Sequence, residues 1–183
     1  MNHNQKLSKM KKLVLSLAII ILTVSTVIGQ DTEIKSLKST HLNFGFNIGA
    51  PLGKTTSDLV EFVLGGDLQL AYQASEKFYL TASAGFDVWH GKKAKNSNYV
   101  PLLGGLRLYI SDKVYFSEQA GYAIGVSKDA TTGAKIKGAF TNVAGIGVNL
   151  GQISDILLCY KGLFHSGANQ NVIALRVSYN FGK

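Results

Sequence analysis

Residues 172–181 read VIALRVSYNF and form the clearest pattern in the chain. Large apolar side chains occupy every second position from Ile173 to Phe181, while Arg176, Ser178 and Asn180 lie between them. Successive side chains of a strand point to opposite faces. The segment therefore predicts a β-strand with one apolar face and one polar face.

Seven segments upstream repeat this alternation, and none has a sustained helical stripe. The eight segments lie within residues 42–49, 61–73, 77–88, 100–110, 114–126, 136–150, 155–165 and 173–181. Segments of about ten residues suit tilted membrane strands, and lipid offers no hydrogen-bond partners to an open sheet edge. We therefore predict an all-β fold: a closed, eight-stranded, antiparallel up-and-down transmembrane β-barrel over residues 42–181.

The connections alternate in length. Short ones fall at residues 74–76, 111–113 and 151–154, and longer ones at residues 51–60, 89–98, 127–135 and 166–171. Outer-membrane barrels have short periplasmic turns and longer outer loops, with aromatic girdles at both interfaces. We expect both mature termini in the periplasm, with outward aromatics at the short-turn end (Tyr72, Phe78, Phe116, Tyr179, Phe181) and at the long-loop end (Phe46, Phe62, Phe86, Phe140, Phe164).

The N-terminal residues predict export. Four lysines precede the apolar run from Leu13 to Leu22, and small residues follow it. This order is typical of a secretory signal peptide, and the run is short for a membrane-spanning helix. We place the signal peptide at residues 1–29, with translation starting at Met1 or Met10, and a short periplasmic tail at residues 30–41.

The composition agrees with a membrane barrel. Cleavage leaves 15 basic and 11 acidic residues, a net charge of +4, which does not indicate nucleic-acid binding. Only 16% of the chain is charged, whereas soluble domains average about 25%. The single cysteine, Cys159, excludes an internal disulfide.

From residue 42 to residue 181 the chain resembles the small bacterial outer-membrane β-barrels of the OmpX and OmpA-barrel type. Its C-terminal run, with alternate aromatics Tyr179 and Phe181, resembles the signal read by the barrel-assembly machinery. The resemblance implies the bacterial outer membrane as the location, with that machinery as a partner during biogenesis.

Charged residues on the polar face predict the barrel interior. Eight strands enclose a space that side chains just fill. We therefore expect a closed, ion-paired lumen without a large pore, built from Asp67, Lys77, Asp87, Arg107, Asp155, Lys161 and Arg176. Glu118 and Asn142 instead fall on the apolar face, where an acidic group is costly. We expect a β-bulge to turn Glu118 inward.

Motifs for catalysis or cofactor binding are weak. The glycines of the stretch from Gly49 to Thr55 are one residue too close for a phosphate loop, and a strand follows instead of a helix. The strand glycines indicate bends and bulges in a curved sheet. His165 and Ser166 are adjacent, so on a regular strand they point to opposite faces. We predict no catalytic residues, no cofactor and no metal site.

A basic cluster in one long loop is the candidate contact site. Lys92, Lys93 and Lys95 would lie near phosphorylated lipopolysaccharide if the long loops face outward. The sequence thus favours a structural or surface-interaction role in the outer membrane, with lipid and lipopolysaccharide as partners. Two alternatives stay open: a lipid A deacylase or acyltransferase using His165, and a soluble lipocalin-like binding barrel.

Overall fold

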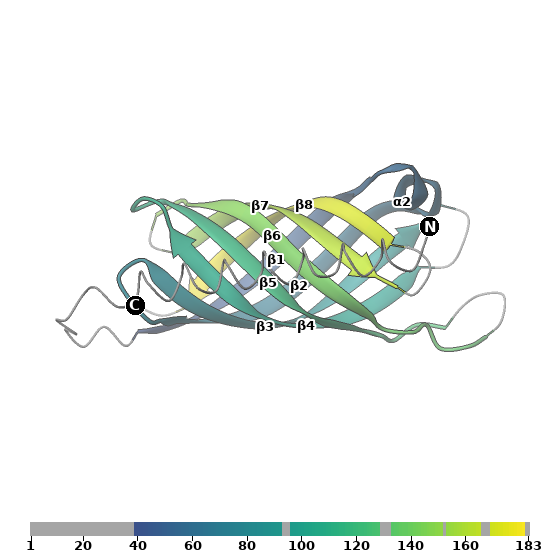
Figure 1. Cartoon of the computed structure of the whole chain (residues 1–183), viewed down its shortest axis with the longest axis horizontal. Coiled ribbons are helices and arrows are strands. Elements are labelled where there is room, and N and C mark those ends of the chain that lie inside the picture. The colour runs from purple at the N-terminus through teal and green to yellow at the C-terminus, as the bar shows by residue number, and fades with distance from the viewer. Residues whose placement is uncertain (1–38, 93–95, 129–132, 152, 166–168, 182–183) are drawn as a thin grey trace, which may run out of the picture. The chain divides into compact units, whose positions relative to one another are not determined.

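The computed structural model describes residues 39–181, apart from residues 93–95, 129–132, 152 and 166–168. In this part of the chain, eight antiparallel strands close into a barrel in which β8 pairs with β1 (Figure 1). The strands are β1 (Thr40–Leu52), β2 (Val60–Gln73), β3 (Phe78–Gly91), β4 (Ser97–Tyr109), β5 (Val114–Gly125), β6 (Ala139–Asn149), β7 (Ser154–Phe164) and β8 (Asn169–Phe181). The predicted closed eight-stranded barrel is confirmed. The predicted signal peptide lies outside the described residues.

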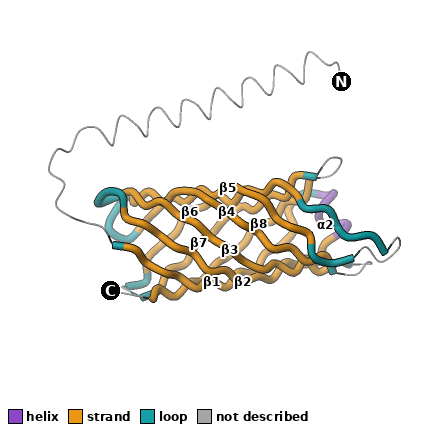
Figure 2. The backbone as a smooth tube through the Cα atoms, turned by 90° about the horizontal axis from the view of Figure 1, so that it is seen from below, coloured by secondary structure: helices purple, strands orange, loops and turns teal. Residues whose placement is uncertain are grey.

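Tight hairpins join β2 to β3, β4 to β5 and β6 to β7. Backbone hydrogen bonds close them, as where Ile110 N donates to Val114 O at 2.8 Å. The short helix α2 (Lys54–Leu59) connects β1 to β2 and lies at the other end of the barrel (Figure 2). No helix among the described residues is long and apolar enough to cross a membrane.

The outer face is predominantly apolar along the strands. On β8 the side chains of Ile173, Leu175, Val177, Tyr179 and Phe181 are 42–49% exposed, whereas the inward residues Val172, Ala174, Arg176 and Ser178 are buried. A continuous apolar surface of this kind is not tolerated in water, and it matches the outward belt of a membrane barrel. A soluble lipocalin-like barrel needs the opposite arrangement, with its apolar face around an internal ligand.

Several strands are longer than the alternation predicted. Because β1 continues to Leu52, Phe46 lies midway along the strand and not at the long-loop end. Because β3 continues to Gly91 and β4 begins at Ser97, Trp89 and Tyr99 belong to the sheet. Both point inward and are buried, although Trp89 was assigned to a loop.

Two irregularities change the expected faces near the long loops. A register shift between Val60 and Phe62 leaves Glu61 exposed, so its predicted inward position is wrong. The Phe62 ring stacks on the His90 ring with centroids 4.7 Å apart. Ile136 precedes β6 and packs against the interior cluster, not toward lipid as predicted.

The bulge predicted at Glu118 is also wrong. The pairing of β5 with β4 and with β6 runs without interruption past this residue. Glu118 lies opposite Leu106 on one side and Ala144 on the other, on the outer face. The strand keeps its regular alternation and carries the acidic side chain outward.

Candidate functional site in the barrel interior

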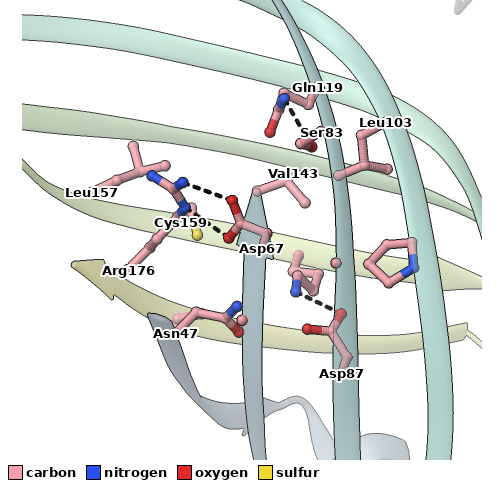
Figure 3. Close-up of a pocket in the computed structure, with 15 residues that line it drawn as sticks. Asn47, Asp67, Ser83, Asp87, Leu103, Gln119, Val143, Leu157, Cys159 and Arg176 are labelled. Atoms are coloured by element: carbon pink, nitrogen blue, oxygen red, sulfur yellow. Dashed lines mark hydrogen bonds and ion pairs between the residues drawn. The ribbon is translucent and has the colours of Figure 1, made fainter. Parts of the chain in front are cut away.

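Arg176 and Asp67 form a bidentate ion pair in the lumen. Arg176 Nε donates to Asp67 Oδ2 at 2.9 Å, and Arg176 Nη2 donates to Asp67 Oδ1 at 2.7 Å (Figure 3). Two parallel bonds of this kind fix the guanidinium as well as its charge. The pair links β8 to β2 past the intervening strand β1.

Asp155 is the second anchor of the interior charges. Its carboxylate is completely buried and accepts a hydrogen bond from Tyr115 Oη at 2.7 Å. Arg107 Nη1 lies 3.5 Å from Asp155 Oδ2, and Arg176 Nη1 lies 3.9 Å from Asp155 Oδ1. Arg107 also donates to Gln69 Oε1 at 3.0 Å. The negative charge of this one carboxylate therefore partly offsets the positive charges of two guanidinium groups.

The third ion pair joins β7 to β3. Lys161 Nζ donates to Asp87 Oδ2 at 2.8 Å, and both side chains are buried. Lys77, by contrast, is exposed beside the turn before β3, so its predicted place in the interior network is wrong. Beside a turn its long side chain reaches solvent. When Lys77 is left out, the predicted interior set consists of three acidic and three basic residues.

Inward glycines make room for these pairs. A Cβ at Gly45 would overlap the Arg176 guanidinium, and a Cβ at Gly147 would overlap the Tyr115 ring. Gly45 lets Arg176 cross β1 to reach Asp67, and Gly147 lets Tyr115 cross β6 to reach Asp155. The sequence analysis attributed strand glycines to curvature and missed this role. An inward glycine on the strand between two partners is the signal that identifies it.

Packed side chains fill both ends of the lumen. Toward the long loops, an apolar cluster surrounds Trp89, which is only 1% exposed. Its buried members are Val60, Val63, Trp89, Tyr99, Ala123, Ala139, Leu163 and Val172. Toward the short turns, Tyr109 lies between Tyr79 and Tyr115, with ring centroids 5.4 and 5.5 Å apart. The Arg107 Cζ lies 4.1 Å from the Tyr115 ring centroid, which joins the rings to the ion pairs.

A cavity of about 40 Å³ remains in the middle of the barrel, lined by Asp67, Asp87, Lys161 and Arg176 among others (Figure 3). This volume suits water molecules in a polar site and is far below the volume of an ordinary ligand pocket. Among the described residues, no group of three or more His, Cys, Asp or Glu side chains is arranged to hold a metal ion.

Comparison with solved structures identifies the architecture. Ail, the attachment invasion locus protein of Yersinia pestis, aligns with a TM-score of 0.60 at 14% identity, covering 79% of this chain and 100% of Ail. The N-terminal β-barrel domain of Pseudomonas aeruginosa OprF aligns with a TM-score of 0.58 at 11% identity, covering 77% and 97% of the two chains. No family model and no curated sequence matches.

The chain has the fold of a small outer-membrane β-barrel. A second structure of Ail, in a phospholipid bilayer nanodisc, aligns with a TM-score of 0.54 at 15% identity and covers 78% of this chain and 100% of that one. At such low identity the likeness concerns the fold alone. The resemblance inferred from the strand pattern is confirmed at this level.

The basic loop residues and the C-terminal aromatics lie apart from the ion pairs, whereas Cys159 lines the central cavity beside them. Lys92 is exposed beyond β3, and Lys93 and Lys95 lie outside the described residues. Tyr179 and Phe181 point outward at the end of β8, with ring centroids 4.9 Å apart. Cys159 is a free, buried thiol.

His165 follows β7 at the long-loop end. Its ring centroid lies 6.1 Å from that of Tyr99, and Ser166 lies outside the described residues. Partial burial lowers the pKa of His165 below its ordinary value.

Proposed function

We propose that this chain is an integral outer-membrane protein whose barrel serves a structural or surface-interaction role, without a large pore and without catalysis. The supporting observation is the filled lumen: six buried or partly buried charged side chains pair with one another, and packed rings and aliphatic groups occupy both ends. An eight-stranded barrel of this kind is a packed core and not a conduit.

Planar-bilayer recording of the purified full chain tests the closed lumen. We expect the current to stay near that of the protein-free bilayer, because an ion entering would have to displace matched charges. A large and stable conductance would contradict the proposal.

The long-loop end is the proposed interaction surface, and charge distinguishes it from the short-turn end. Among the described residues, the exposed charges at the long-loop end are Lys54, Lys92, Lys128, Lys135 and Lys137 against Asp58 and Glu61. The short-turn end has Lys77 and Lys113 against Glu76 and Asp112. A basic rim attracts phosphate groups, so we propose that this end faces outward and that Lys92, Lys93 and Lys95 contact lipopolysaccharide phosphates.

Replacing Lys92, Lys93 and Lys95 together by glutamine tests the contact. We expect normal assembly, weaker binding to lipopolysaccharide and a smaller dependence of binding on salt, because screened Coulomb attraction is removed. Glutamine at Lys77 and Lys113 is the matched control and should leave binding unchanged. Parental binding by the triple variant at low salt would refute the contact.

Biogenesis adds a transient partner. We propose that the barrel-assembly machinery reads Tyr179 and Phe181, whose exposed rings end the strand that closes the barrel. Alanine at both positions should slow the appearance of the folded, heat-modifiable form in cells, whereas alanine at Tyr122, an exposed ring on β5, should not.

A non-catalytic role predicts that overexpression leaves the mass of lipid A unchanged. A change in lipid A mass that disappears in His165→Ala would replace this proposal with an outer-membrane enzyme.

A further inference from the structure

Beyond the ends of β5 and β6 the chain continues as a two-stranded arm. Lys128 pairs with Lys135 in an antiparallel bridge. Next to this bridge, Ile136 N donates to Ser127 O at 2.9 Å. The arm extends past the ends of the strands at the long-loop end (Figure 1). It is therefore a paired element, although residues 129–132 at its tip lie outside the described residues.

The base of the arm is fixed to the barrel. Val126 N donates to Asn98 O at 2.9 Å, and Asn98 N donates to Ser127 Oγ at 2.9 Å. On the other side of the arm, Ile136 packs against the apolar cluster around Trp89. Both sides are thus held, so the barrel sets the direction of the side chains on the arm.

Three exposed lysines lie on the outer face of this arm. Lys135 and Lys137 flank Ile136, whose side chain faces the interior, so both point away from the lumen. Lys128 lies directly opposite Lys135, and opposed residues of an antiparallel pair project to the same side. The outer face of the arm therefore carries three positive charges close together.

The pairing of Lys128 with Lys135 favours a bound anion. Like charges directly opposite each other on neighbouring strands are destabilising. Within the described residues of the arm, 126–128 and 133–138, no acidic side chain offsets them, and Asp129 lies outside those residues. An anion between the two ammonium groups would remove the repulsion and accept charge-assisted hydrogen bonds from both. A phosphate group has the charge and the number of oxygens for this.

The wall below the lysines indicates the source of the phosphate. On the same outer face, Tyr122, Ile124, Val126 and Phe140 are 39–53% exposed. These side chains belong to the apolar belt that faces lipid, so the lysines begin where the belt ends. Lysine side chains at that level extend along apolar surface and place their ammonium groups among the lipid headgroups. An outward site at the edge of the belt adjoins lipid phosphate, whereas a soluble anion would meet the tip of the arm or the mouth of the barrel first.

We propose that Lys128, Lys135 and Lys137 form a phosphate site for lipid A in the leaflet around the long-loop end. Lys128 and Lys135 hold one phosphate between them from the two sides of the arm, and Lys137 adds a third positive charge nearer the barrel wall. The site is separate from the basic loop between β3 and β4. It deepens the proposed function and rests on it, because lipid A surrounds this end only if the long loops face outward.

Binding of lipid A to the full chain in phospholipid nanodiscs tests the site. The background is the chain whose basic loop between β3 and β4 already carries the three glutamines described above, so that the remaining binding reports on the arm. Lys128→Gln with Lys135→Gln should weaken the binding of bisphosphorylated lipid A several-fold and leave that of dephosphorylated lipid A unchanged. Lys77→Gln with Lys113→Gln removes the same charge at the short-turn end and is the matched control. All these side chains are exposed, so every variant should keep heat-modifiable migration.

Single substitutions test whether the two lysines share one phosphate. If they do, Lys128→Gln and Lys135→Gln should each weaken binding nearly as much as both together, because residues that act on one ligand are not additive. Lys128→Glu should weaken binding further, since the glutamate would pair with Lys135 and repel the phosphate. Independent effects that multiply in the double variant would overturn the shared site.

Other results also overturn the site on the arm. Unchanged binding in the double variant, or an equal loss with dephosphorylated lipid A, would exclude lipid phosphate as its ligand. Inorganic phosphate that displaces lipid A at equal concentration would assign the lysines to a free anion. Loss of binding through the basic loop alone would overturn the arm site and leave the proposed function standing. A parent chain that does not bind bisphosphorylated lipid A would overturn both.

Discussion

Acidic side chains have different partners on the inside and on the outside of the barrel. Asp67 in the lumen faces a guanidinium that binds both of its oxygens, and Asp155 lies among two guanidinium groups and a tyrosine hydroxyl. Glu118 on the outer wall lies between Leu106 and Ala144 across the neighbouring strands.

The difference follows from what surrounds each wall. A narrow lumen brings side chains from distant strands within bonding distance, so charges can be matched inside one chain. On the convex outer wall, side chains from strands two apart diverge. A polar group there can reach only side chains on its own strand and on the two adjacent strands. Inside the barrel, matched charges therefore hold distant strands together, whereas an acidic group on the outer wall has apolar cross-strand neighbours.

Breaking the interior balance should have the largest effect. Asp155→Asn keeps the side-chain shape but removes the counter-charge of Arg107 and Arg176. We expect the free energy of unfolding to fall by about 3 kcal/mol, because buried charges lose their partner. The measurement is denaturant unfolding in lipid vesicles, followed by fluorescence of Trp89, the only tryptophan.

Asp112→Asn, in an exposed turn, is the control and should change stability by less than about 0.5 kcal/mol. If Asp155→Asn and the parent had the same free energy of unfolding, the ion pairs would fill the lumen without stabilising the fold.

Filling an inward glycine should have the next largest effect. Gly45→Val introduces a side chain where the Arg176 guanidinium lies, which we expect to cost about 2 kcal/mol through overpacking. Gly104→Val on the outer wall adds the same group to open space and should cost little. The same unfolding assay compares the two variants. A larger loss at Gly104 would argue against the crossing of Arg176 over β1.

Removing the outer acid should have a smaller effect of the opposite sign. In vesicles with enough lipid to keep the barrels apart, Glu118→Leu should raise the free energy of unfolding by about 1 kcal/mol, since a carboxyl no longer faces hydrocarbon. A loss of stability under these conditions would mean that Glu118 is already satisfied within a single barrel.

The smallest effect concerns pH at the long-loop end. Burial lowers the pKa of His165 below 6.5, so the unfolded chain binds a proton at a higher pH than the folded barrel. The stabilisation from neutral His165 is present above about pH 6.5 and is lost as the pH falls from there to the lower folded-state pKa. His165→Asn should flatten the stability profile in that window. If the stability of His165→Asn changed with pH as steeply as that of the parent, the pH dependence would come from other titrating groups.

Several residues show how far sequence reasoning could go. The alternation around Arg176 predicted its inward direction, and the same rule placed Asp67, Asp87, Arg107, Asp155 and Lys161 in the interior. The rule failed for Lys77 and Ile136, which lie outside the strands, and for Glu61, which lies at the register shift of β2. It was correct for Glu118, where the expected bulge was an unnecessary exception.

The sequence by itself determined the faces of the barrel and the number of its strands, because a period of two is a local property that any strand expresses through its own backbone. Only the tertiary structure decided which charges meet. Asp67 and Arg176 are 109 residues apart, and they meet because closure of the barrel, the register of β1 and the absence of a side chain at Gly45 together place them within reach. The pairing of β5 with β6 likewise decided that Glu118 and Asn142 are diagonal neighbours on the outer face.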